Sequence, residues 1–560
     1  MKIKVPVEKG KSYEIEIKTL GTSGEGVGRY QEFTVFVPYA LPGEKVLAGI
    51  EEVKKTYAKG KLQKILTKSA DRVAPICAIY DKCGGCQLQH LDYMAQLKAK
   101  RQQVIDAITR IGKQSGVYVE PTIGAATPWN YRNKMQFPVG KQKGKTIIGC
   151  FAQGSHQIID TTDCHIQKEG NNEVVNAIRE IVNKLNIPVY NEDKHSVVLR
   201  HVVGRVGKKG DIMVIIVTAS DKMPREKEFV KMLRAKLPKV VSIQQNIQTY
   251  RNNVIMGRDT KLLWGKPTIL DNIGRLSFHI SPRSFFQVNT EQAEVLYNKA
   301  LEFADLHGEE TVIDAYCGTG TITLFLAQKA REVYGIEIVK PAIQDAKKNA
   351  RDNNVRNAEF IVGDATVIMP KLYRQGIRAN VVVVDPPRAG CTEVVLETFA
   401  NMKPEKIVYV SCNPASLARD MAVLEKLGYK AKKVQPVDMF PNTSHVETVV
   451  LLSHKKADSY IHIDVEFGEG EGKIPVDSIA KRAEAYKPKE KVTYKMIKEY
   501  IEAKYGFKVH TAYIAEVKRN LGLPMYDAPN AVEELKQPRK HPTAEKVEAI
   551  KDALKYFGVI

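Results

Sequence analysis

The spacing of apolar residues changes along the chain and predicts several distinct parts. From Tyr13 to about Lys68, short stretches of alternating apolar and polar residues are separated by glycine turns such as Gly21–Gly26. Alternation with a period of two is typical of strands that are buried on one face, and a series of such strands between tight turns predicts a small β-barrel. We therefore expect a barrel over residues 1–70.

The next part mixes helical and extended patterns. Met94–Gly112 places apolar residues at helical spacing among many basic ones, whereas Gly210–Ser220 is short and apolar. The first pattern predicts a helix and the second a buried strand. We assign residues 71–280 to a central α+β domain.

Strands and helices then alternate over residues 281–456. Four short apolar strands end in acidic or glycine-rich sequence; they are Val312–Asp314, Val333–Ile336, Ala358–Gly363 and Asn380–Val384. A further strand, Ile407–Val410, is stopped by Asn413 and Pro414, so Cys412 is expected at its carboxyl end. This alternation predicts a Rossmann-like parallel sheet, in which ligands bind at the carboxyl edge.

Residues 457–560 do not continue this pattern. Thr493–Ile501 and Thr511–Leu521 are predicted to be helices, with Gly506 as a stop between them, and the sequence FGEGEGK before them is typical of a linker. Two helices around a short turn can form a helix-turn-helix-like nucleic-acid binder. A plain helical extension remains the alternative.

Charge points to a polyanionic partner. The chain has 85 Lys plus Arg against 64 Asp plus Glu, a formal net charge of +21, which favours RNA or DNA over a membrane. Asn130–Lys134 combines an aromatic ring, an arginine and amides, and could either contact nucleotides or form a solvated turn. No apolar run approaches the roughly 20 residues that span a bilayer, and no signal peptide is apparent. We expect a cytoplasmic protein.

Four cysteines have informative spacing. Cys77, Cys83 and Cys86 lie close together, with a Gly-Gly pair before the third, and Cys164 follows much later. In a reducing compartment such thiols are more often metal ligands or nucleophiles than disulfides. The spacing favours an iron–sulfur cluster, and a zinc site remains the alternative.

Acidic residues at the strand ends suggest the kind of ligand. Glu337 lies where a carboxylate can accept hydrogen bonds from ribose hydroxyls, but the turn at Gly318–Gly320 lacks the third glycine of the dinucleotide fingerprint. Asp364 and Asp385 follow the next two strands. Because these acids would repel a phosphate, we expect a cationic adenosyl ligand, S-adenosylmethionine.

A set of ordered motifs resembles the RNA 5-methyluridine (uracil-5-)-methyltransferase family. The motifs are CxxxxxCxxC, FFQVN, DAYCGTGT, GIE, VVVVDPPR, VSCNP and HVETVVLL. The resemblance covers residues 1 to about 455. The barrel looks like the OB-like TRAM domain of the family's 23S ribosomal RNA branch, and the cysteines resemble that branch's 4Fe-4S ligands. The transfer-RNA branch typically lacks both.

The resemblance implies roles for individual residues. Cys412 would be the nucleophile and Glu447 the general base. The residues implied to bind the methyl donor or line its site are Gln287, Tyr316, Thr321, Glu337, Asp364 and Asp385. The implied cluster ligands are Cys77, Cys83, Cys86 and Cys164.

The expected reaction follows from the weak nucleophilicity of uracil C5. Addition of the Cys412 thiolate to C6 would form an enolate that takes the methyl group, after which Glu447 would remove the C5 proton. A stacked base cannot reach a cleft, so base flipping is implied, at a cost of about a few kcal/mol.

We therefore expect an α/β protein with four parts: a TRAM barrel, an α+β domain, a Rossmann-like S-adenosylmethionine-dependent methyltransferase domain and a small helical extension. It would act as a monomer on 23S ribosomal RNA. A transfer-RNA uridine-5-methyltransferase is the nearest alternative, and a noncatalytic RNA-binding assembly factor is the alternative from another class. The sequence does not identify the uridine that is modified.

Overall fold

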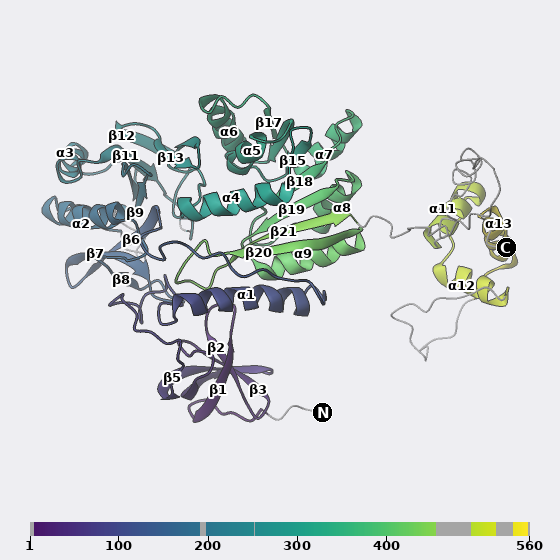
Figure 1. Cartoon of the computed structure of the whole chain (residues 1–560), viewed down its shortest axis with the longest axis horizontal. Helices are drawn as coiled ribbons and strands as arrows, with labels where there is room; N and C mark the ends of the chain where they lie inside the picture. The colour runs from purple at the N-terminus through teal and green to yellow at the C-terminus, as the bar shows by residue number, and fades with distance from the viewer. Residues whose placement is uncertain (1–4, 191–197, 251, 455–493, 522–540, 558–560) are drawn as a thin grey trace, which may run out of the picture. The chain divides into compact units, whose positions relative to one another are not determined.

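The structure is a computed structural model that describes residues 5–190, 198–250, 252–454, 494–521 and 541–557 (Figure 1). Its contacts divide the chain into two compact units, Met1–Ser459 and Tyr460–Ile560. Within the described ranges, no helix combines the length and the hydrophobicity that crossing a lipid bilayer requires.

The N-terminal barrel predicted from the alternating pattern is confirmed. Its strands are β1 (Ser12–Leu20), β2 (Gly26–Tyr30), β3 (Phe33–Val37), β4 (Lys45–Val53) and β5 (Tyr57–Thr67). They close in the order β1-β2-β3-β5-β4. Inward-facing apolar residues such as Ile15, Val35 and Val46 fill the interior. At Gly28 an added Cβ would lie 2.4 Å from the carbonyl oxygen of Glu16, so this position requires glycine for β1 and β2 to pair.

The central domain is built on a seven-stranded sheet of order β12-β11-β10-β9-β6-β7-β8. Its strands are β6 (Lys134–Gln142), β7 (Lys145–Phe151), β8 (Ile158–Asp160), β9 (Leu199–Val206), β10 (Ile212–Thr218), β11 (Val240–Ile247) and β12 (Asp259–Gly265). Helices α2 (Glu169–Lys184) and α3 (Glu226–Lys236) share a hydrophobic core with the sheet. The hairpin of β13 (Ile269–Ile273) and β14 (Leu276–Ile280) leads on to the catalytic domain.

Helix α1 (Tyr93–Arg110) precedes the central sheet in sequence but packs elsewhere. Its buried residues Val104, Ala107 and Ile108 belong to the hydrophobic core of the catalytic sheet. Figure 1 shows α1 alongside α9 of that domain. The helix therefore joins two segments that lie more than 300 residues apart in the chain.

The Rossmann-like domain is confirmed, with strand order β17-β16-β15-β18-β19-β21-β20. Its elements are α4 (Thr290–Ala304), β15 (Thr311–Asp314), α5 (Thr321–Ala327), β16 (Glu332–Glu337), α6 (Lys340–Asp352), β17 (Ala358–Val362), α7 (Ala365–Arg374), β18 (Val381–Val384), α8 (Glu393–Asn401), β19 (Lys406–Ser411), α9 (Pro414–Lys426), β20 (Tyr429–Val437) and β21 (Glu447–His454). The strand order reverses between β15 and β18, which is where such sheets open a ligand crevice. Only β21 runs antiparallel to its neighbours.

The second unit contains three described helices, α11 (Tyr494–Tyr505), α12 (Thr511–Asn520) and α13 (Ala544–Tyr556). The two helices predicted on either side of Gly506 are confirmed, and that glycine has a φ of 74° just after α11. Ile501, Val517 and Leu554 lie in the core that these helices share. The predicted FGEGEGK linker lies outside the described residues.

Two residues of the segment Asn130–Lys134, Tyr131 and Asn133, fit neither sequence interpretation, whereas Asn130 is exposed and Arg132 is partly exposed. Tyr131 is 6% exposed and donates its hydroxyl hydrogen bond to the carbonyl of Pro441, 3.0 Å away. Asn133 is 3% exposed and its amide donates to the carbonyl of Gln287 at 3.0 Å. These two hydrogen bonds join the central domain to the catalytic domain. Burial keeps both side chains away from nucleotides and from solvent.

Candidate active site

The carboxyl ends of the parallel strands place the predicted functional residues along one edge of the catalytic sheet. Asp314, Glu337, Asp364, Asp385 and Cys412 lie at or just beyond the ends of β15, β16, β17, β18 and β19 respectively. Because β21 runs in the opposite direction, its first residue, Glu447, starts at this same edge. Ser411 pairs with Thr448, so the next step of the register places Cys412 opposite Glu447. The two residues implied to act on the base are thus brought together.

Glu447 sits in a strongly desolvated position. It is 6% exposed, and burial raises its pKa to about 8; the charge of Asp385 adds to the shift and Arg388 opposes it. Burial and the charge of Asp314 likewise raise the pKa of Asp385 to about 7. Burial and the neighbouring acid therefore favour the protonated form of Glu447.

The Cys412 thiol is not activated in the free site. Burial raises its pKa to about 11, with further contributions from the charges of Glu447 and Asp385, and Arg388 works in the opposite direction. The sequence suggested an easily ionised thiol, but neighbouring carboxylates favour the protonated form. A cation bound at this edge would lower the pKa of Cys412 and of both acids.

Two neighbours were not singled out from the sequence. Asp314 is fully buried, accepts a hydrogen bond from the Thr323 hydroxyl at 2.6 Å, and has a pKa that burial raises to about 6. The sequence could have indicated Asp314 as a site residue, because it is the last residue of the strand before the glycine turn. Arg388, in the Asp-Pro-Pro-Arg motif, is the cation whose charge reaches both Cys412 and Glu447.

The residues implied to bind the methyl donor fall into two groups. Gln287 and Thr321 both contact the hydroxyl of Tyr297, whose pKa is raised by burial and by the charges of Asp385 and Glu447, so this group lies beside the acids. Two others, Glu337 and Asp364, are tied to the backbone of their own segments. Glu337 accepts from the amide of Val339 at 2.9 Å and Asp364 accepts from the amide of Thr366 at 2.8 Å.

The edge suits a cationic ligand that approaches the backbone closely. Burial raises the pKa values of three acids at this edge, Asp314, Asp385 and Glu447, and the charge of a neighbouring acid adds to each shift. In the glycine turn, Gly318 has a φ of 53°, and an added Cβ there would meet nothing within 4 Å. The turn is therefore open, and its left-handed backbone favours glycine.

Tyr316 lies beside the glycine turn and is partly exposed. Burial raises its pKa, and its hydroxyl interacts with the buried Cys391. Cys391 also accepts a hydrogen bond from the hydroxyl of Tyr409 at 3.8 Å. Cys391 is thus a packing residue beneath the site, as Cys317 is within the turn, where it is 4% exposed.

A cavity of about 470 Å³ lies between Gln287 and Arg388, which neighbour this site, and the cysteines near the barrel; Cys412 and Glu447 do not line it. Gln287, Arg388, Phe440 and His445 line it on the catalytic side. The cysteines that line it are Cys77, Cys83, Cys86, Cys150 and Cys164. The four cysteines selected by spacing are therefore brought together, with Cys150 as a fifth.

The cysteines do not form a metal site in the described residues. No group of three or more His, Cys, Asp or Glu side chains there is arranged to hold a metal ion. The thiol of Cys150 instead donates a hydrogen bond to Cys83, which lowers the pKa of Cys83 to about 7 against the opposing effect of burial. Burial raises the pKa of Cys86 to about 12. The donor type suits iron and sulfur, but the arrangement is not that of a formed centre.

The fold and the edge residues define a Rossmann-like methyltransferase with an N-terminal TRAM barrel. The tRNA (Uracil-5-)-methyltransferase family matches residues 92–455, and the TRAM domain matches residues 6–62. The chain belongs to this family of uracil-5-methyltransferases and is an RNA methyltransferase.

Its relatives match almost over their whole length. An uncharacterized RNA methyltransferase of Clostridium tetani is 53% identical over 455 residues, which cover 81% of this chain and 99% of that protein. Another, from Halalkalibacterium halodurans, is 52% identical with the same coverage. Among solved structures, the Pyrococcus abyssi tRNA (uracil-54, C5)-methyltransferase in complex with S-adenosyl-L-homocysteine is 29% identical. It covers 79% of this chain and 100% of its own, with a TM-score of 0.64.

We predict that Glu447 controls the ionisation of Cys412. In Glu447→Gln the carboxylate that raises the pKa of the thiol is lost, so alkylation of Cys412 by iodoacetamide should reach its half-maximal rate at a lower pH than in the wild type, by about 1 pH unit. Mass spectrometry of the Cys412 peptide measures this rate.

Glu405→Gln is the matched control for this experiment. Glu405 is an exposed carboxylate at the opposite end of β19, so its neutralisation should leave the alkylation profile unchanged. An unchanged profile in Glu447→Gln would show that the two side chains do not interact.

Proposed function

We propose that this protein methylates C5 of uridine in 23S ribosomal RNA, with S-adenosylmethionine as the methyl donor and Cys412 as a covalent nucleophile. The observation that supports the proposal is the pairing of Ser411 with Thr448, which brings the adjacent residues Cys412 and Glu447 to the ligand edge of the sheet, close enough for the charge of Glu447 to act on the thiol. The Pyrococcus abyssi enzyme with a similar fold was solved with S-adenosyl-L-homocysteine, which supports the donor.

A cationic donor would balance the negative charge of the acidic residues in the site. Its sulfonium would supply the positive charge that the buried acids lack, lowering the pKa of Cys412 and of Glu447 together. Donor binding would thus prepare both the thiolate and the carboxylate. Arg388 reinforces this effect from the cavity side.

The proposed reaction has three steps. The thiolate of Cys412 forms a bond to C6 of the flipped uracil, and the electron pair moves through C5 to O4 as an enolate. C5 then attacks the methyl carbon, whose bond to the sulfonium sulfur breaks and leaves S-adenosylhomocysteine. Glu447 takes the C5 proton, the bond between C6 and sulfur breaks, and the thiolate is regenerated.

Two RNA substrates are compatible with this chemistry. The barrel and the cysteine group support ribosomal RNA, because the sequence resemblance associates both with that branch of the family. The likeness to the Pyrococcus abyssi transfer-RNA enzyme supports transfer RNA as the second candidate. We propose further that the protein acts as a cytoplasmic monomer.

We propose that Cys77, Cys83, Cys86 and Cys164 hold a 4Fe-4S cluster. Their position on the lining of one cavity supports this assignment. No step of the methylation requires the cluster. Its role would be to fix the segment after the barrel against the central domain.

The substrate is tested by mapping 5-methyluridine in a strain that lacks the gene. We expect a 5-methyluridine in 23S ribosomal RNA to disappear and transfer RNA to remain unchanged. Loss from transfer RNA alone would reverse the choice of substrate, and unchanged modification of both RNAs would favour the noncatalytic assembly role.

The cluster is tested by metal analysis of anaerobically purified protein. We expect iron and acid-labile sulfide in the wild type and in Cys150→Ser, and neither in Cys83→Ser, because only Cys83 is assigned as a ligand. Stoichiometric zinc without sulfide would contradict the assignment.

The mechanism is tested by trapping the covalent intermediate. Glu447→Gln can still add its thiolate and transfer the methyl group, but its amide cannot take the C5 proton. Product release should therefore fall by at least about 100-fold, and a denaturation-resistant protein–RNA band that carries the donor's methyl label should accumulate. Cys412→Ala should form no such band.

Tritium release from RNA labelled at uracil C5 completes this test. The wild type should release tritium with each methylation, and both variants should not. Wild-type turnover in Glu447→Gln, or an adduct in Cys412→Ala, would overturn the assignment of base and nucleophile.

A further inference from the structure

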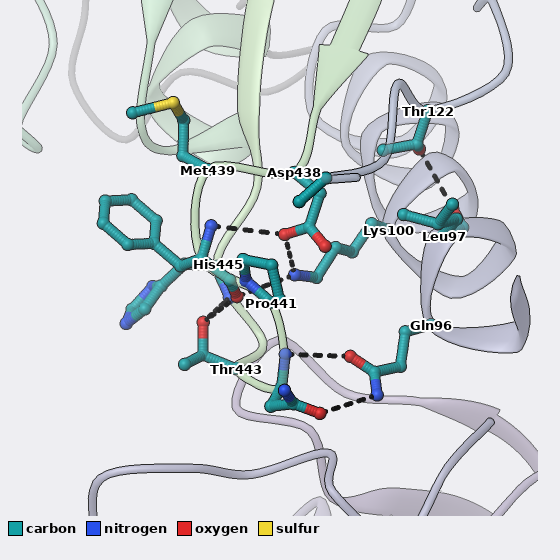
Figure 2. Close-up of polar contacts among 12 residues, drawn as sticks. Gln96, Leu97, Lys100, Thr122, Asp438, Met439, Pro441, Thr443 and His445 are labelled. Atoms are coloured by element: carbon teal, nitrogen blue, oxygen red, sulfur yellow. Dashed lines mark hydrogen bonds and ion pairs between the residues drawn. The ribbon is translucent and has the colours of Figure 1, made fainter. Parts of the chain in front are cut away.

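The loop that delivers Glu447 is held by a helix from the other end of the chain. Residues 438–446 connect β20 to β21 and end immediately before Glu447. Figure 2 shows Lys100 and Gln96 reaching from α1 to this loop. Most of the loop is buried, whereas His445 is exposed and lines the cavity together with Phe440.

A buried ion pair forms the centre of this contact. The ammonium of Lys100 lies 2.5 Å from a carboxylate oxygen of Asp438, and the two side chains are 1% and 0% exposed. Lys100 also donates to the carbonyl of Phe440 at 3.1 Å. The other oxygen of Asp438 accepts from the Tyr93 hydroxyl at 3.0 Å, so two residues of α1 bind one carboxylate.

A second contact from α1 fixes the turn of the loop. Asn442 has a left-handed backbone with a φ of 66°. Its amide nitrogen donates to the side-chain oxygen of Gln96 at 3.0 Å, and the side-chain nitrogen of Gln96 donates back to the side-chain oxygen of Asn442 at 3.2 Å. This paired contact compensates for a conformation that non-glycine residues rarely adopt.

The buried ion pair contributes more to the geometry of the loop than to the stability of the fold. An ion pair removed from water gains little net free energy compared with apolar residues of similar size, because desolvation offsets the attraction. The ion pair instead fixes the geometry of the loop. Lys100 binds both Asp438 and Phe440, which lie in the first half of the loop, just after β20. The conformation of the loop is therefore fixed before it reaches Glu447.

We propose that Lys100, through its ion pair with Asp438, is a positioning residue that holds the loop of residues 438–446 so that Glu447 reaches the C5 proton of the methylated adduct. This inference rests on the proposed function and assigns to α1 a part in its final step. Lys100 is 1% exposed and does not line the cavity, so it acts through the loop. Its loss should slow proton removal more than adduct formation.

The test compares full-length variants in the trapping experiment. Lys100→Met leaves the carboxylate of Asp438 buried without its cation and should lower the thermal midpoint. Lys100→Met combined with Asp438→Leu removes both charges and should recover much of that midpoint. If the pair positions the loop, this stable double variant should still accumulate the methyl-labelled adduct and release product at least tenfold more slowly than the wild type.

Two further variants separate positioning from folding. Gln96→Met removes the contact to Asn442, and with it the hydrogen bonds to the carbonyls of Leu88 and Leu91, without leaving a buried charge. It should give the same accumulation of adduct. Lys98→Met changes an exposed lysine on the same helix and should behave as the wild type. Binding of S-adenosylmethionine, measured by calorimetry, should be unchanged in all of them.

The outcomes are distinct. Release at the wild-type rate by both the double variant and Gln96→Met, each folded, would overturn the positioning role. If the double variant does not fold, Lys100→Met assayed below its thermal midpoint decides: adduct accumulation supports the positioning role, and release at the wild-type rate overturns it. Failure of Glu447→Gln itself to form any adduct would instead count against the proposed function.

Discussion

The antiparallel pairing of β21 with β19 is the constraint on which the active site depends. The other strands of the catalytic sheet run in one direction, so only β21 can begin at the edge where they end. That edge is where Cys412 lies, and the pairing of Ser411 with Thr448 brings Glu447 to face it. A slip of one residue would turn Glu447 to the other face of the sheet. Backbone hydrogen bonds between β19 and β21 therefore bring Cys412 and Glu447 to the same place.

Burial then determines the protonation of the acidic residues at this edge of the sheet. Asp314, Asp385 and Glu447 all have raised pKa values, and in each of them desolvation is the largest cause. Two of them also raise the pKa of Cys412. A site of this kind is electrostatically incomplete without a cation, and Arg388 supplies only part of the positive charge that the acids need. The donor would thus act on the protonation of the site as well as carry the methyl group, and the neutral product that remains would withdraw that charge again.

The sequence could predict the strand ends but not the long-range contacts. Apolar runs that end in Asp314, Glu337 and Asp385 mark where strands stop. Because parallel strands end at the same edge of a sheet, the pattern alone predicted that these acids lie close together. The pairing of Cys412 with Glu447 came only from the family resemblance. Lys100 and Asp438 are 338 positions apart, and a lysine in a basic helix is ordinarily exposed, so no local signal marked their pair. Cys150 gave no spacing signal either, because it joins the other cysteines only through the fold.

The loop before Glu447 also explains why the segment after the barrel belongs to one compact unit with the catalytic domain. The backbone amides of Gln87 and Leu88, next to Cys86, donate to the carbonyl of Asn442 at 3.1 and 3.0 Å. At Gly24, in a barrel turn, an added Cβ would lie 3.0 Å from the Cβ of Gln87, so the barrel packs against the same place. The barrel, the cysteine segment and α1 thus converge on the loop that ends at Glu447. Because hydrogen bonds to its backbone fix the loop, parts that look separate in the sequence also determine the position of Glu447.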